Sequence, residues 1–274
     1  MINKLKNNPL IANFINFLKN FLKIPDKLVT SILLFSVRPV PLKNFIIITG
    51  ADSSHYKSLV QLLSSIMLYE KNTKVIVFDL GLTDLEKNKL NEKIKTIETI
   101  EIRKFDYSKY PNFFNIKINA GEYAWKPVII SNILNEFKCS VIWMDAGDVI
   151  LSPLKTIRKI LNLTGFYSPY SEKKISSWTH PKTLKFLEAS SKILEKRNLN
   201  GACIAANYNF SEVKEVIDKW KQCALMKECI APEGSSRKNH RQDQATLSVI
   251  AYQGNIVNLL FKKFYGFKIQ QDIN

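Results

Sequence analysis

The sequence has 274 residues, a length that predicts one large domain or two small ones. Hydrophobic residues make up 46% of the chain and charged residues 23%, which excludes disordered, collagen-like and coiled-coil proteins. There are 40 lysines and arginines against 24 aspartates and glutamates, a net charge of +16, so we expect an anionic partner such as a phosphate, a lipid headgroup or a nucleic acid.

Residues 1–43 form a basic segment in which apolar residues recur at helical spacing. Leu10 and Phe14 fall on one side of the expected helix and Lys19 falls on the other. The pattern predicts an amphipathic N-terminal arm whose helix ends at Pro25. Two interpretations stay open: a helix lying on an anionic membrane surface, or a helix packed on the main domain with its lysines solvated.

From residue 44 onward, apolar runs typical of buried strands alternate with helical patterns. Strands are expected at 45–49, 74–79, within 97–104 and at 140–144, with shorter ones at 165–170 and 201–206. Helices are expected at 56–69, 83–95, 125–137, 210–229 and 242–253, the second opening with a Thr83–Glu86 capping box. This order predicts an α/β domain over residues 44–274 with a mostly parallel central sheet. Ligands of such sheets bind beyond the carboxyl ends of the strands.

The four cysteines are too few and too scattered for a disulfide scaffold, and none forms a C-x-x-C pair. We therefore expect a reduced, cytoplasmic compartment, with the cysteines buried mostly as small apolar residues. A zinc site made from Cys223, Cys229 and His240 fits no common ligand spacing. Neither a G-x-G-x-x-G nor a P-loop motif is present, so dinucleotide-binding and P-loop functions lose their main support.

The sharpest chemical feature is a pair of carboxylates after the apolar run 141–144. Asp145 and Asp148 follow this run and are separated only by Ala146 and Gly147. Two close carboxylates repel each other, and a hard divalent cation relieves that repulsion, so the pattern predicts Mn²⁺ or Mg²⁺ held by Asp145 and Asp148. The alternative is a simple turn in which Asp145 caps the next element and Gly147 supplies a positive φ.

This acidic segment, with Pro153-Leu154 a few residues later, resembles the nucleotide-sugar glycosyltransferases of the GT-A fold, and the family-8-like members in particular. Further segments resemble the same enzymes in the same order, at 45–56, 75–83, 122–127, 200–204 and 240–244. The resemblance covers roughly residues 44–260 and implies a single Rossmann-like GT-A domain. It departs at Gly147, which stands where the family has its second aspartate. Either a local bulge lets Asp148 reach the metal, or Asp145 works with a ligand from elsewhere.

The resemblance also implies roles for individual residues on the donor side. The expected contacts to the nucleotide or its phosphates are listed here in chain order: Thr49, Gly50, Asp52, Tyr56, Lys126 and Asp145. Lys126 falls in the first turn of a helix, where free N–H groups also favour an anion. The implied donor is a nucleotide-diphosphate sugar, with a UDP-sugar favoured.

The late segment around Asp243 supplies the remaining catalytic candidates. Asp243 either caps the helix that begins there, or faces the acceptor hydroxyl as a base or stabilises the cationic sugar. Arg241 is a second candidate cation for the departing diphosphate, or else pairs structurally with Asp243.

The expected function is therefore metal-assisted transfer of a sugar to a glycan or lipid-linked acceptor, in cell-surface polysaccharide synthesis. The basic arm at residues 1–40 fits peripheral placement on the cytoplasmic face of a membrane. Two alternatives belong to other classes. A nucleotidyltransferase would use the same carboxylates on a nucleoside triphosphate, and a nucleic-acid-binding module would use the charge alone, although no binding motif supports it.

Overall fold

The structure is a computed structural model, and it describes residues 34–258 and 264–273 of the chain. The amphipathic helix expected within residues 1–33 lies outside the described residues. None of the described helices is long and apolar enough to cross a membrane.

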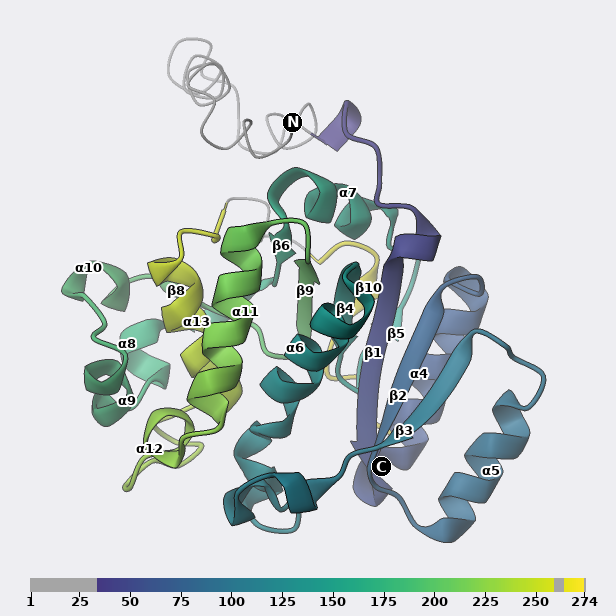
Figure 1. Cartoon of the computed structure of the whole chain (residues 1–274), viewed down its shortest axis with the longest axis horizontal. Helices are drawn as coiled ribbons and strands as arrows, with labels where there is room; N and C mark the ends of the chain where they lie inside the picture. The colour runs from purple at the N-terminus through teal and green to yellow at the C-terminus, as the bar shows by residue number, and fades with distance from the viewer. Residues whose placement is uncertain (1–33, 259–263, 274) are drawn as a thin grey trace.

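A six-stranded sheet forms the centre of the molecule, in the order β3-β2-β1-β4-β9-β6 (Figure 1). Its strands are β1 (Phe45–Asp52), β2 (Lys74–Gly81), β3 (Ile100–Lys104), β4 (Ser140–Met144), β6 (Phe166–Tyr167) and β9 (Cys203–Asn207). Strands β3, β2, β1 and β4 are parallel, and β9 runs antiparallel to both β4 and β6. The predicted α/β class with a mostly parallel sheet is confirmed.

Helices and short pairs of strands surround this sheet. The longer helices are α4 (Tyr56–Tyr69), α5 (Asp84–Ile94), α6 (Trp125–Phe137), α7 (Lys155–Thr164), α11 (Ser211–Ala224) and α13 (Gln242–Gln253). The shorter ones are α8 (Ile175–Trp178), α9 (Pro181–Phe186), α10 (Ser191–Leu194) and α12 (Lys227–Ile230), with 3-10 turns η2 (Leu42–Asn44), η3 (Ser53–His55), η4 (Tyr107–Lys109), η5 (Asn112–Phe114) and η6 (Asn119–Tyr123). Two ribbons complete the fold, β5 (Val149–Ile150) with β10 (Phe267–Lys268), and β7 (Tyr170–Lys174) with β8 (Arg197–Leu199).

Several expected elements have the predicted bounds, namely α4, α6, β4 and α13. The capping box of α5 is also confirmed, because the Thr83 hydroxyl accepts from the Glu86 N–H at 3.3 Å and the Glu86 carboxylate accepts from the Thr83 N–H at 2.8 Å. The helix expected at 210–229 is wrong in one respect. It breaks after Ala224 into α11 and α12.

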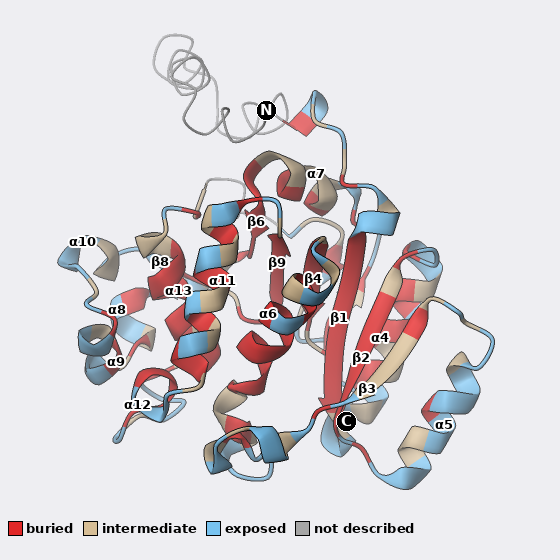
Figure 2. Ribbon diagram, viewed as in Figure 1, coloured by how far each residue is buried: buried red, intermediate tan, exposed pale blue. Residues whose placement is uncertain are grey.

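The core explains why β1 and β4 read as unbroken apolar runs. Both strands are buried along almost their whole length, with helices packed on them (Figure 2). A strand covered on both faces has no solvent side, so no alternation of polar and apolar residues is expected. The candidate functional residues lie at the carboxyl ends of these strands, where Asp52 ends β1 and Asp145 follows β4.

Cys223 and Cys229 form a disulfide that joins α11 to α12. The expectation that all four cysteines are reduced is therefore wrong for this pair, while Cys139 and Cys203 are free thiols. The zinc hypothesis fails for the same reason, because both sulfur atoms are bonded to each other. Sequence spacing gives no signal for this pair, since the two cysteines are six positions apart and form no recognised motif.

Gly165 ends α7 with a φ of +76°, a backbone conformation that residues other than glycine rarely adopt. A Cβ added there would lie 2.4 Å from Phe210 Cγ, whereas one added at Gly234, which has a φ of +85°, would meet nothing closer than 3.6 Å. Gly165→Ala is expected to lower the free energy of unfolding by about 1–3 kcal/mol, and Gly234→Ala by clearly less. Urea denaturation measures both, and equal losses would contradict the packing at Phe210.

Candidate active site

The site is organised around the buried ammonium of Lys126, the second residue of α6, whose side chain is 3% exposed. Its Nζ lies 2.9 Å from Asp145 Oδ1 and 3.1 Å from Asp243 Oδ2. The same nitrogen donates to the Gly201 carbonyl at 3.0 Å. One hydrogen bond and two ion pairs thus surround a buried ammonium, so Lys126 is placed to balance the two carboxylates rather than to meet a phosphate.

The charges of this group depend on one another. Burial alone would lower the pKa of Lys126, but the carboxylates of Asp145 and Asp243 outweigh burial and raise it above its usual range. Burial raises the pKa of the Asp243 carboxyl, and Lys126 opposes that rise. Lys126 therefore stays protonated at neutral pH and acts as the counter-charge that lets Asp243 lie in the interior.

The backbone brings these residues together from distant parts of the chain. The Asp145 N–H donates to the Ala202 carbonyl at 2.9 Å, which extends the pairing of β4 and β9 by one step. Beside it, the Gly201 N–H donates to Gln244 Oε1 at 3.2 Å. A Cβ at Gly201 would lie only 3.2 Å from Asp243 Oδ2, so this position needs glycine for close approach.

Asp148 is fully buried, and neither of its carboxylate oxygens has a hydrogen-bond partner among the described residues. A turn closed by the Asp148 N–H and the Asp145 carbonyl, at 2.9 Å, brings it back beside Asp145. Burial, and then the charge of Asp145, raise the pKa of Asp148. This turn accommodates the one additional residue that separates Asp145 from Asp148, compared with the spacing of the two aspartates in the GT-A motif. Gly147 does not have a positive φ, so the proposed turn role for that glycine is wrong.

The C-terminal tail adds a third carboxylate that the sequence analysis missed. The Gln271 N–H donates to the Gly147 carbonyl at 2.6 Å, and the Ile273 N–H donates to Ser58 Oγ at 2.9 Å. A Cβ on Gly147 would lie 2.4 Å from Asp272 Oδ1, so the Asp272 carboxylate packs against the Gly147 Cα and would have to turn away from a larger residue. The tail thus ends at the same edge as the strand ends (Figure 1). No sequence motif marks Asp272, because its position depends on the pairing of β10 with β5, which are far apart in the sequence.

We tested whether these residues fit a divalent metal ion. Within residues 34–258 and 264–273, no group of three or more histidine, cysteine or acidic side chains is placed to hold one. Mg²⁺ and Mn²⁺ need only one or two protein carboxylates when substrate phosphates and water complete the shell. Asp148 offers two buried oxygens without partners. Asp145 is 39% exposed, although its Oδ1 already accepts from Lys126 and from Trp143 Nε1 at 2.6 Å. The pair fits a metal that is shared with a substrate.

The residues expected on the nucleotide side divide into two groups. Thr49 and Gly50 are buried within β1, which runs on to Asp52, so they do not reach a ligand surface in this structure. Asp52 and Tyr56 lie at the open end, where Tyr56 starts α4 and packs partly on the core. His55, which the sequence analysis did not single out, pairs with Asp52 through Nδ1 at 2.9 Å.

The candidate residues of the late segment 240–244 lie in different surroundings. His240 is buried, its Nε2 lies 2.7 Å from the Ile230 carbonyl, and burial lowers its pKa to about 4. Asp243 is inside α13 rather than at its cap, and its side chain joins Lys126. Arg241 does not pair with Asp243. Its guanidinium instead stacks over Trp178, with Cζ 3.9 Å from the ring centroid.

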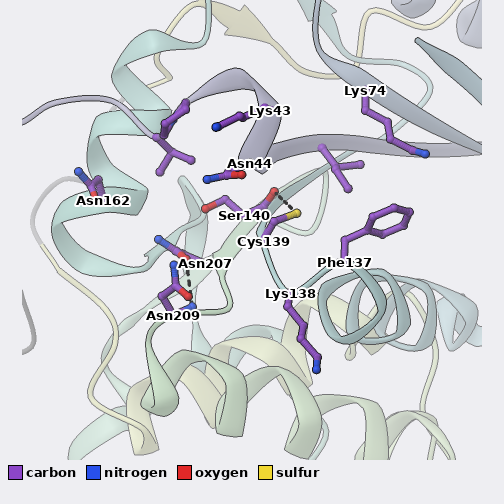
Figure 3. A pocket seen from close by; sticks show the side chains of 13 residues that line it. Lys43, Asn44, Lys74, Phe137, Lys138, Cys139, Ser140, Asn162, Asn207 and Asn209 are labelled. Atoms are coloured by element: carbon purple, nitrogen blue, oxygen red, sulfur yellow. Dashed lines mark hydrogen bonds between the residues drawn. The ribbon is translucent and has the colours of Figure 1, made fainter. Parts of the chain in front are cut away.

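A hollow of about 450 Å³ lies at the opposite end of the sheet (Figure 3). It is lined by residues at the amino ends of the strands, including Asn44, Lys74 and Ser140. Parallel strands of this class bind ligands at their carboxyl ends, so we do not assign the donor to this hollow.

Comparison with known proteins places the fold. The family model described as "Protein of unknown function (DUF1647)" matches residues 13–131, and no curated protein sequence matches the chain. Among solved structures, a variant of the galactosyltransferase LgtC is similar at 11% identity and a TM-score of 0.50, over 74% of this chain and 70% of that one. The mannosyltransferase Ktr4p from S. cerevisiae is similar at 9% identity and a TM-score of 0.50, over 78% and 68%.

The chain has a GT-A fold. The predicted fold is therefore confirmed, whereas membership of family 8 stays a prediction. A match to the bifunctional glycosyltransferase WbbM, at 14% identity and a TM-score of 0.47, covers 77% of this chain but only 37% of that protein. Likeness at such identities establishes architecture, and the reaction has to be argued from the site.

His55 is expected to titrate above its usual pKa of 6.5, because its hydrogen bond to Asp52 favours the charged ring and the charges of Asp272 and Asp145 add to this, against burial. Its protonation then stabilises the fold below pH 6.5, and that contribution is lost as pH rises through the folded-state pKa. Asp52→Asn should lower the His55 pKa more than Asp272→Asn does. Histidine NMR titration measures both shifts, and a wild-type pKa at or below 6.5 would contradict the pairing.

Proposed function

We propose that this protein is a glycosyltransferase that moves a sugar from a nucleotide-diphosphate sugar to a glycan or lipid-linked acceptor. The GT-A fold supports this proposal because LgtC and Ktr4p, which share the architecture, are sugar transferases. The observation that carries it is the Asp145–Asp148 turn at the carboxyl end of β4, where a buried carboxylate lacks any partner.

An unpartnered buried carboxylate is unfavourable unless a ligand compensates it. Asp145 and Asp148 would hold Mn²⁺ or Mg²⁺, which would neutralise the departing diphosphate and so favour its release. A UDP-sugar remains the favoured donor, and the nucleotide would lie towards Asp52 and Tyr56 at the end of β1. Lys126 is assigned to positioning rather than to phosphate binding, since its ammonium is buried and its charge is paired with Asp145 and Asp243.

Asp243 is the residue that we assign to the acceptor side of the reaction. Its carboxylate is held by Lys126 at 3.1 Å, close to the backbone of Gly201. From there it can orient an acceptor hydroxyl, or stabilise positive charge on the transferring sugar. The same proposal includes a membrane-surface role for residues 1–40, which would suit a lipid-linked or cell-surface acceptor.

The decisive variant for this proposal is Asp148→Asn, which keeps the shape of the buried side chain and removes its charge. Wild-type protein is expected to gain thermal stability with UDP or GDP only when Mn²⁺ is present, and to transfer sugar from the matching donor. Asp148→Asn should lose the Mn²⁺-dependent shift and lower transfer about 100-fold or more. A matched control is Asp106→Asn, which makes the same change at an exposed acid that caps η4 and has no role in the proposal.

Calorimetric or dye-based unfolding and a donor panel provide the readouts. An Asp148→Asn protein that keeps both the Mn²⁺-dependent shift and full transfer would refute the metal assignment. A wild-type shift with nucleoside triphosphates but with no nucleotide sugar would favour nucleotidyl transfer instead.

A further inference from the structure

Two arginines near the site stack on aromatic rings and face no acid. Arg241 Cζ lies 3.9 Å from the centroid of Trp178, and Arg237 Cζ lies 5.0 Å from the centroid of Tyr123. Arg237 also donates a hydrogen bond to the Tyr123 hydroxyl. We call Arg237 and Arg241 the guanidinium pair. A stacked guanidinium keeps in-plane N–H groups that can point outward, the arrangement that matches a carboxylate or phosphate.

The guanidinium pair carries uncompensated positive charge. Among the described residues, no carboxylate lies within 4.0 Å of either guanidinium. A third cation, Lys173, adds to the excess, because its Nζ lies 4.8 Å from the Trp178 ring that Arg241 also covers. Burial lowers the pKa of Arg241, and the nearby positive charge of Arg237 lowers it further, as expected for two guanidiniums that repel each other. An anionic ligand would relieve this repulsion.

The guanidinium pair is continuous with the candidate active site. The Tyr123 ring that carries Arg237 also lies 5.8 Å from the Lys126 ammonium. Arg241 directly precedes α13, the helix that holds Asp243, and both η6 and α8 pack against α13. The pair therefore lies on the Asp243 side of Lys126, whereas Asp52 and His55 lie at the end of β1.

The backbone that supports the pair is strained. Asn119, Ala120, Gly121, Glu122 and Tyr123 all have positive φ, between 48° and 61°, and Gln242 has a φ of 32°. The two strained stretches are tied together, because Gln242 Nε2 donates to Glu122 Oε2 at 3.3 Å. Left-handed backbone at residues other than glycine is costly and persists mostly at functional sites. Here it sets the position of Tyr123 and of the start of α13.

We propose that the guanidinium pair binds an anionic group, a phosphate or a carboxylate, carried by the acceptor. That the anion belongs to the acceptor rests on the proposed function, whereas the binding of an anion by Arg237 and Arg241 does not. The aromatic rings hold the guanidiniums in place, so little side-chain freedom is lost when an anion binds. The site thus selects a charged acceptor sugar over a neutral one, next to the carboxylate of Asp243.

Direct binding tests this inference without any transfer assay. The probes are glucose 6-phosphate, glucuronate, inorganic phosphate and neutral glucose, measured by calorimetry on the full chain without nucleotide or metal. Wild-type protein is expected to bind the phosphate or the carboxylate sugar and to bind glucose at least about tenfold more weakly. Arg237→Gln and Arg241→Gln should each weaken the charged sugar about tenfold or more. Lys238→Gln, which removes the same charge from the same loop, should leave binding unchanged.

Each outcome decides the proposal. A preference for glucose 6-phosphate over glucuronate identifies phosphate as the recognised group, the reverse preference identifies carboxylate, and equal binding of inorganic phosphate shows that the sugar adds nothing. Equal affinity for glucose and the charged sugars, no binding of any probe, or equal losses in Lys238→Gln would overturn the proposal. Arg237 is exposed, so its variant should fold even if Arg241→Gln does not. Mn²⁺-dependent UDP binding, measured in parallel, should stay intact in Arg237→Gln and Lys238→Gln, and its absence from the wild-type protein would count against the proposed function only.

Discussion

The structure depends on one buried cation. Lys126 lies between Asp145 and Asp243 and is closed off by the Gly201 carbonyl, so four segments distant in the sequence meet at a single nitrogen. Carboxylates are rarely stable in an interior without a partner, and a lysine with no acid would lose its charge there. The two carboxylates therefore keep Lys126 protonated, and its charge opposes the rise that burial causes in the pKa of Asp243. This mutual dependence fixes α6, the end of β4 and the start of α13 relative to one another.

Around that cation the edge of the sheet divides into two regions of opposite charge. Asp148 and the tail carboxylate of Asp272 lie on the side of β1, where a positive ion would be attracted. Arg237 and Arg241 lie on the side of α13, where a negative group would be attracted. A transferase that separates a diphosphate from a sugar needs both kinds of surface.

Local patterns allowed much of the fold to be predicted from the sequence. The bounds of α4, α6, β4 and α13 follow from periodicity and apolar runs, and Asp145, Lys126 and Asp243 were singled out as candidates before their contacts were known. Long-range placement was not predictable. Nothing in the sequence places Asp272 against Gly147, because that contact depends on β10 pairing with β5. The Cys223–Cys229 bond and the extension of β1 to Asp52, which leaves Thr49 inside the strand, also depend on packing that spacing alone does not encode.

The free energy of unfolding of Lys126→Met, measured by urea denaturation at pH 7 and pH 5, tests the central role of this lysine most directly. Removing the ammonium leaves Asp145 and Asp243 without a counter-charge, so we expect a loss of about 3–5 kcal/mol at pH 7. The loss should be smaller at pH 5, because burial raises the pKa of the Asp243 carboxyl, which therefore binds a proton more readily as the pH falls. Adding Asp243→Asn should recover part of it. An unchanged stability at pH 7, or an equal loss at both pH values, would contradict the central role of Lys126.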